Sequence, residues 1–230
     1  SKEIELKAGL NRFDSTVQDD FKKIPGSPVA YWVSEKVREI FDVSPSLSLI
    51  AETRKGMVTG SNENYVRSWY EINTSTFGST GYSRESAKKS GLKWFPYNKG
   101  GGFRKWYGNK LDVVNWQDDG VLLQTARHPK ENRIWATNFN LDYIFKPNVN
   151  WGAVTSSEFS ARYSSGSELF DAGGSAAFTE NYSLPLLIAY LNSYVASYCL
   201  KTINPTLNFQ AGNISNLPIK IMTSDTVATS

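Results

Sequence analysis

One stretch of the sequence alternates cations, aromatic rings and glycines. It covers residues 93–109 and reads KWFPYNKGGGFRKWYGN. Lysine and arginine side chains can neutralise phosphates, aromatic rings can stack on displaced bases, and glycine lets backbone N–H groups approach an anion closely. These residue types predict a polyanion-binding surface. A pair of strands with buried rings and a solvated cationic face would explain the same alternation equally well.

The positive charge of the chain is concentrated around this stretch. The 230 residues have a net charge of only +3, yet eight basic residues and one acidic residue lie between Arg84 and Lys110. The rest of the sequence is therefore mildly acidic. A basic stretch on such a background is typical of a surface that faces a polyanion. We predict phosphate contacts for Lys99, Arg104, Lys105, Lys88, Lys89, Gly100, Gly101 and Gly102.

The sequence contains no combination of residues that predicts catalysis. The one histidine, His128, lies beside Pro129 in a loop-like segment, and the one cysteine, Cys199, lies on an apolar stripe. A structural zinc site needs about four Cys or His ligands, and a single cysteine cannot form a disulfide within the chain. We therefore predict no catalytic residues, no metal site and a buried structural role for Cys199.

The apolar segments are too short to predict a membrane span. Residues 184–200 are interrupted by Asn192, Ser193 and Ser197, whereas a spanning helix needs about 20 apolar residues. Residues 1–10 lack the apolar run of a signal peptide. We expect a cytoplasmic protein with no membrane partner.

Helices are predicted towards both ends of the sequence. Ser27 as the N-cap and Pro28 as the first residue predict a helix that ends before Pro45. A second, short helix is predicted after Ser61. Residues 184–199 carry an apolar stripe at helical spacing, which predicts one long helix.

The middle of the sequence predicts strands. Residues 103–107 and 111–116 flank residues 108–110 as a hairpin would, and residues 117–120 predict a turn. Further short strands are predicted at residues 142–145, 159–163, 168–170 and 176–179. Periodic positions predict a core location for Tyr31, Trp32, Trp69 and Trp116.

Together these elements predict an α+β fold. We expect a single domain over residues 25–220, with a β-rich middle, an N-terminal helix and a long C-terminal helix. Residues 1–24 are interpreted as a lead-in segment and residues 221–230 as a disordered tail.

Six segments, in order along the chain, resemble the PglX-type adenine methyltransferases of BREX phage-defence systems. The last of them also resembles the end of target-recognition domains in type I specificity subunits and TaqI-like enzymes. The six segments are residues 21–34, 59–71, 94–116, 159–163, 191–193 and 204–219. The resemblance therefore implies the DNA target-recognition half of such an enzyme.

In that family a catalytic domain precedes this region, binds S-adenosylmethionine and holds the target adenine with an Asn-Pro-Pro-aromatic motif. The present sequence has no such motif and no glycine motif for the cofactor. The resemblance thus implies no cofactor and no methyl transfer for this chain alone. Its implied partners are double-stranded DNA and the methyltransferase domain, and other BREX subunits or phage DNA-mimic proteins are further candidates.

The resemblance also implies that this chain and the catalytic domain hold DNA between them. Side chains of this chain are then expected to contact the edges of the bases. Asparagine and arginine can form paired hydrogen bonds with adenine and guanine edges. We predict base readout by Asn62, Asn64, Arg67 and Arg162. An N-cap with a surface helix explains the first three equally well, and a charge at a strand edge explains Arg162.

Three alternatives remain open on the sequence. The same recognition domain could belong to a fused restriction–modification enzyme. The chain could be a protein-interaction domain for other defence subunits or for a phage DNA mimic. Its seven Trp and twelve Tyr residues could also form a carbohydrate-binding module, although sugar binding does not require the clustered positive charge.

Overall fold

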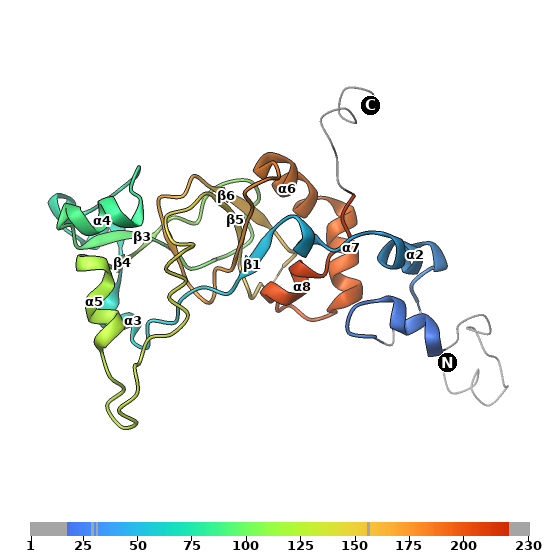
Figure 1. Cartoon of the computed structure of the whole chain (residues 1–230), viewed down its shortest axis with the longest axis horizontal. Helices are drawn as coiled ribbons and strands as arrows, with labels where there is room; N and C mark the ends of the chain where they lie inside the picture. The colour runs from blue at the N-terminus through green and yellow to red at the C-terminus, as the bar shows by residue number, and fades with distance from the viewer. Residues whose placement is uncertain (1–17, 29, 31, 156, 221–230) are drawn as a thin grey trace.

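The computed structural model describes residues 18–28, 30, 32–155 and 157–220. Within them two four-stranded sheets lie between helices, so the α+β class is confirmed (Figure 1). The first sheet has the order β1-β8-β5-β6 and consists of antiparallel neighbours. Its strands are β1 (Glu52–Arg54), β8 (Ala176–Phe178), β5 (Asn148–Trp151) and β6 (Ala161–Ser164).

The second sheet has the order β2-β4-β3-β7, and its β3–β7 pair is parallel. Its strands are β2 (Val66–Ser68), β4 (Asp112–Asn115), β3 (Trp94–Asn98) and β7 (Leu169–Phe170). Every residue of β3 and β4 except Pro96 and Asp112 is buried. Both strands are therefore core elements, although β4 begins directly after the basic stretch.

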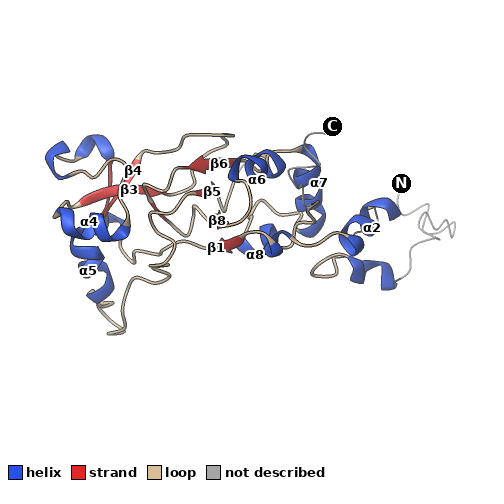
Figure 2. Ribbon diagram, turned by 45° about the horizontal axis from the view of Figure 1, so that its top comes forward, coloured by secondary structure: helices blue, strands red, loops and turns tan. Residues whose placement is uncertain are grey.

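Each sheet supports its own hydrophobic cluster. Helices at one end of the molecule pack on the first sheet, and a second group covers the other sheet at the opposite end (Figures 1 and 2). The first group contains α6 (Leu184–Leu191) and α8 (Ala211–Ser215), which contact the sheet, and α7 (Tyr194–Ile203), which packs on both of them; α2 (Glu35–Val43) lies further out, beside η1 (Gln18–Lys23). The second group contains α4 (Arg84–Ser90) and α5 (Gln117–Thr125). Further short elements complete the fold: α3 (Asn62–Tyr65), η2 (Leu47–Leu49), η3 (Trp69–Glu71) and η4 (Thr74–Thr76).

The two sheets meet at a junction built from glycine backbone. A side chain at Gly100 would place its Cβ 2.2 Å from the oxygen of Gly173 and 2.9 Å from the Cα of Gly152. The backbone of Ala153 also donates to the oxygen of Gly173 at 2.9 Å. Because only glycine permits such close backbone approach, these residues fix how the two halves of the molecule join.

The N-terminal helix begins later than predicted. Gly26 and Ser27 both have positive φ angles, and tight turns follow until Ser34, the actual N-cap of α2. These turns bury Ala30 and Val33 without helical geometry. The helix ends at Val43, before Pro45 as predicted.

Packing extends into the segment interpreted as a lead-in. Ile24 is buried in the first hydrophobic cluster, directly after η1. Residues 1–17 and the tail predicted to be disordered, 221–230, lie outside the described residues.

The apolar stripe of residues 184–199 forms two helices rather than one. Asn192 ends α6, and its side chain donates to the oxygen of Ala161 and accepts from the nitrogen of the same residue. Ser193 then caps α7 by accepting from the nitrogen of Ala196. The side-chain hydrogen bonds to β6 fix the break, which hydrophobic spacing alone cannot reveal.

The hairpin predicted between residues 103–107 and 111–116 is not present. Strand β4 pairs with β3, while residues 103–107 leave the second sheet and lie beside β6 through a bridge between Trp106 and Arg162. Residues 142–145 form turns instead of a strand. The other three predicted strands are present as β6, β7 and β8 with shifted ends.

Aromatic burial was only partly predicted. Trp116 is fully buried, but Trp32 and Trp69 are 54% and 49% exposed, and Tyr31 lies outside the described residues. The turn predicted at residues 117–120 contains three consecutive left-handed residues, which lead directly into the helical part of α5. Trp69 lies in η3, on the rim of the second sheet, where its exposure becomes relevant to binding.

Candidate nucleic-acid interface

Residues 99–111, here called the bridging loop, connect β3 to β4 and cross from the second sheet to the first. The nitrogen of Trp106 donates to the oxygen of Ala161, and the oxygen of Trp106 accepts from Tyr163, each at 2.9 Å. At the other end the oxygen of Leu111 accepts from the nitrogen of Trp69 at 2.9 Å. The loop therefore has backbone anchors on both halves of the molecule, and its exposed side chains occupy a defined surface.

The three predicted phosphate-binding cations of this loop lie in different environments. Lys99 is only 26% exposed and lies 3.7 Å from the carboxylate of Asp171, so its charge is partly balanced. The ammonium of Lys105 donates to the backbone oxygen of Asn192 at 3.1 Å. Arg104 is exposed, and no acidic side chain among the described residues pairs with its guanidinium. Arg104 is therefore the loop cation most available to an anion.

The three predicted glycines also separate into two roles. Gly100 is buried at the sheet junction and serves packing rather than anion binding. Gly101 and Gly102 are exposed, and the side chain of Asn109 donates to the oxygens of Gly100 and Gly102 at 2.8 Å each. These hydrogen bonds hold the exposed part of the turn in one conformation. The backbone of Gly101 and Gly102 is thus open to a ligand.

Lys88 and Lys89 lie in the last turn of α4. Both are exposed, and Lys89 pairs with Glu85 at 2.6 Å on the same helix face. An exposed pair of this kind contributes little to stability. The two lysines therefore remain accessible to an external anion.

Large aromatic side chains are exposed on and beside the bridging loop. Large apolar side chains that are left exposed can mark interaction sites. The most exposed rings are Trp69 at 49%, Tyr70 at 68%, Phe103 at 48%, Trp106 at 54% and Tyr107 at 64%. The sequence prediction missed Trp69 and Tyr70 because it placed the former in the core.

A second group of exposed residues was also missed. Tyr194 and Tyr198 on α7 are exposed, and with Lys201 and Lys105 they line a small cavity of about 150 Å³. The spacing of Tyr194, Tyr198 and Lys201 along one face of a helix was the available signal.

Three of the predicted base-reading residues lie on α3 or directly after it, and all three are exposed or partly exposed. Asn62 and Asn64 lie on α3, where the side-chain oxygen of Asn62 accepts from Thr59 at 2.8 Å. The guanidinium of Arg67 donates to the backbone oxygens of Glu63 and Val66, so it caps the end of α3. The two asparagines are therefore more available for base edges than the arginine.

Arg162 does not reach the surface. Its side chain is 1% exposed and lies beneath the bridging loop, donating to the side chain of Asn150 at 3.3 Å and to the oxygen of Arg104 at 3.4 Å. Burial lowers the pKa of Arg162 to about 10, and the nearby Glu168 carboxylate opposes that shift. The arginine predicted to read bases thus supports the loop from below.

Comparison with protein-family models gives no match for this chain. The chain is 42% identical, over 214 residues, to the adenine-specific methyltransferase PglX of Lacticaseibacillus casei. It is 36% identical, over 222 residues, to the adenine-specific methyltransferase BrxX of Escherichia coli. The matches cover 91% and 95% of this chain but only 18% and 17% of the relatives. The chain resembles one segment of these methyltransferases.

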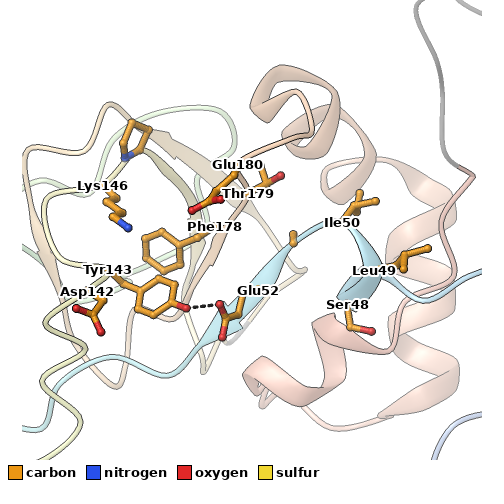
Figure 3. Close-up of a pocket in the computed structure, with 12 residues that line it drawn as sticks. Ser48, Leu49, Ile50, Glu52, Asp142, Tyr143, Lys146, Phe178, Thr179 and Glu180 are labelled. Atoms are coloured by element: carbon orange, nitrogen blue, oxygen red, sulfur yellow. Dashed lines mark hydrogen bonds between the residues drawn. The ribbon is translucent and has the colours of Figure 1, made fainter.

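A cavity beside the first sheet has an excess of negative charge, which is unfavourable for binding a polyanion. The cavity has a volume of about 370 Å³ and lies beside β1 (Figure 3). Three carboxylates line it, from Glu52, Asp142 and Glu180, and Lys146 is the one cation in its lining. The hydroxyl of Tyr143 donates to the carboxylate of Glu52. Excess negative charge here repels phosphate, so the cavity is not part of the candidate interface.

The two residues considered for catalysis have structural surroundings. The Nδ1 of His128 accepts from the nitrogen of Glu131 at 3.2 Å, and its ring packs edge-on against Trp135. Cys199 is buried in the first cluster, and burial raises its pKa to about 11. No group of three potential metal-ligating side chains occurs among the described residues. In the same part of the chain no helix is long and apolar enough to cross a membrane.

Proposed function

We propose that this chain is the DNA target-recognition region of an S-adenosylmethionine-dependent adenine-N6 DNA methyltransferase of BREX phage defence or restriction–modification. One observation carries the proposal: the bridging loop displays free positive charge and exposed aromatic rings across the junction of two sheets. The similarity to methyltransferases named as adenine-specific supports DNA as the polyanion.

The geometry distinguishes the roles of the phosphate-binding candidates. Arg104 and the exposed lysines of α4, Lys88 and Lys89, supply charge to the DNA backbone. Gly101 and Gly102 offer backbone N–H groups beside that charge. Lys99 contributes less because Asp171 balances it.

Lys105 is a positioning residue as well as a cation, since it ties the loop to the end of α6. Asn62 and Asn64 are the proposed base-reading residues, because amide groups form paired hydrogen bonds with adenine. Arg67 can join them after it leaves its two backbone acceptors. Arg162 is assigned to support of the loop.

S-adenosylmethionine supplies the methyl group in such an enzyme, and the glycine run of this chain does not form a site for it. The glycine run begins with Gly100. The backbone of Gly173 already occupies the space beside its Cα, so a ligand cannot lie there. The run also connects two strands and does not open a helix, in contrast to nucleotide-binding glycine loops. We assign methyl transfer to a catalytic domain outside this sequence.

The proposal is tested by the salt dependence of DNA binding. The purified chain is titrated onto a labelled random-sequence duplex over about 50 to 200 mM salt, where the release of counterions from phosphate weakens binding steeply. A variant with Lys88, Lys89 and Arg104 replaced by Ala should bind roughly tenfold more weakly and with a shallower salt slope.

The matched control replaces Lys36, an exposed lysine on α2 at the far end of the molecule, by Ala. It should leave affinity and slope unchanged. Absence of binding at low salt, or binding that does not respond to salt, would overturn the proposal. Selective binding of neutral oligosaccharides would instead favour the carbohydrate-binding alternative.

A further inference from the structure

A cavity of about 340 Å³ opens beside the bridging loop on the side of the second sheet. Its floor is the cross-strand pair Pro96 and Val113 of β3 and β4. Its volume lies within the range of small-molecule sites. Five separate segments contribute to it, and Trp69, Phe77, Tyr107, Lys110, Ser165 and Glu168 are among the residues that line it.

Aromatic rings at the rim of this cavity are left uncovered by the protein itself. The ring of Trp69 packs edge-on against Tyr70 at 6.0 Å, while about half of its surface remains exposed. Tyr107 is 64% exposed on the side of the bridging loop. A planar ligand that enters the cavity would cover both rings and gain stacking energy.

An ion pair with a buried carboxylate supplies two of the polar groups of the cavity, and the carboxylate of Asp112 and the hydroxyls of Ser79, Thr80, Ser165 and Ser167 supply the others. The carboxylate of Glu168 is only 5% exposed, and one of its oxygens lies 3.4 Å from the ammonium of Lys110. The other oxygen accepts from Asn150 at 3.4 Å, which fixes the carboxylate. Lys110 also lies 4.9 Å from the centre of the Tyr107 ring. An ammonium has three donors, so Lys110 can still bind an acceptor on a ligand.

We propose that this cavity receives a single nucleobase that has left the stack of the bound DNA. Trp69 and Tyr107 flank its faces, and the Lys110–Glu168 pair meets its hydrogen-bonding edge. Every nucleobase combines a flat ring with a polar edge, and both features match this lining. This inference rests on the proposed function.

The position of the cavity favours a base of bound DNA over an independent small molecule. Tyr107 and Lys110 belong to the bridging loop, so the cavity and the proposed phosphate-binding surface share one element. The backbone of Trp69 is hydrogen-bonded to the same loop at Leu111. A nucleotide held through its phosphates at Arg104 would therefore place neighbouring bases near the opening.

The test compares two DNA duplexes that differ only in one base. Each carries a single-nucleotide bulge, which has a normal base in one duplex and an abasic sugar in the other. The duplex with the base should bind the chain roughly tenfold more tightly, as expected for stacking of one base on aromatic side chains. Replacing Trp69 or Tyr107 by Ala should remove most of this preference while salt-dependent binding persists.

Trp32→Ala is the matched control, because its ring is exposed to a similar degree but it belongs to the segment that leads into α2. It should retain the full preference, and thermal melting of each variant monitors folding. Equal affinity for the two bulged duplexes would overturn the nucleobase pocket and leave the proposed function intact. A preference that survives both Trp69→Ala and Tyr107→Ala would also overturn it. Failure to bind any duplex would overturn the proposed function and the pocket together.

Discussion

The ammonium of Lys105 lies 3.1 Å from the backbone oxygen of Asn192, at the point where α6 ends. The side chain of Asn192 pairs with both backbone groups of Ala161 on β6. One asparagine thus connects the bridging loop, the break between two helices and the edge of the first sheet. The orientation of the proposed DNA-binding loop depends on this connection.

Lys105→Ala and Arg104→Ala should therefore have different consequences. Arg104→Ala removes an exposed charge, so we expect weaker duplex binding, a salt slope lower by about 1, and unchanged thermal stability. Lys105→Ala should weaken binding and also lower the melting temperature, because the loop loses an anchor. Fluorescence anisotropy and thermal denaturation measure the two effects. Identical behaviour of the two variants would contradict the assignment.

Gly100→Ala should destabilise the protein by more than about 2 kcal/mol, because its Cβ would clash with backbone atoms that cannot move independently. Gly102→Ala is the matched control, since no atom lies within 4 Å of a Cβ at that position. It should change the free energy of unfolding by less than about 0.5 kcal/mol. Urea unfolding followed by circular dichroism measures both changes. A small effect of Gly100→Ala would disprove the packing role of this glycine.

Arg162→Ala should cost about 3 kcal/mol of stability, because it leaves the buried Glu168 carboxylate with less compensating charge and opens a space below the loop. Tyr163→Ala, one position along β6 and 38% exposed, should cost far less. If Arg162 only supports the loop, folded Arg162→Ala protein should show no change in which DNA sequences it prefers. A changed sequence preference would restore the role predicted from the sequence.

Cys199 should react slowly with iodoacetamide at about pH 8 while the protein is folded, because its thiol is buried and protonated. Addition of denaturant should accelerate the reaction. Since burial raises its pKa from 9.0 to about 11, the folded state holds the proton more tightly. This contribution to stability is complete below pH 9.0 and is lost as the pH rises towards 11. Rapid labelling without denaturant would contradict the buried position.

The sequence alone determined the elements whose signals are local. The α+β class, the end of α2 before Pro45 and the strands β6, β7 and β8 follow from periodicity and turn residues. The same applies to the burial of Cys199, which lies on an apolar helical stripe. The clustering of cations and aromatic residues likewise marks the bridging loop in the sequence as a candidate polyanion-binding segment.

Tertiary structure decided everything that depends on partners distant in the chain. Strand β4 could pair with residues 103–107 or with β3 on local grounds, and burial of β3 selects the latter. The break at Asn192 exists because Ala161, thirty-one residues away, supplies its hydrogen-bond partners. Residue type also cannot reveal that Arg162 is buried while Arg104 is exposed. The exposure of each arginine depends on the strand that the bridging loop covers. The contact between this loop and β6 forms only when the two sheets join.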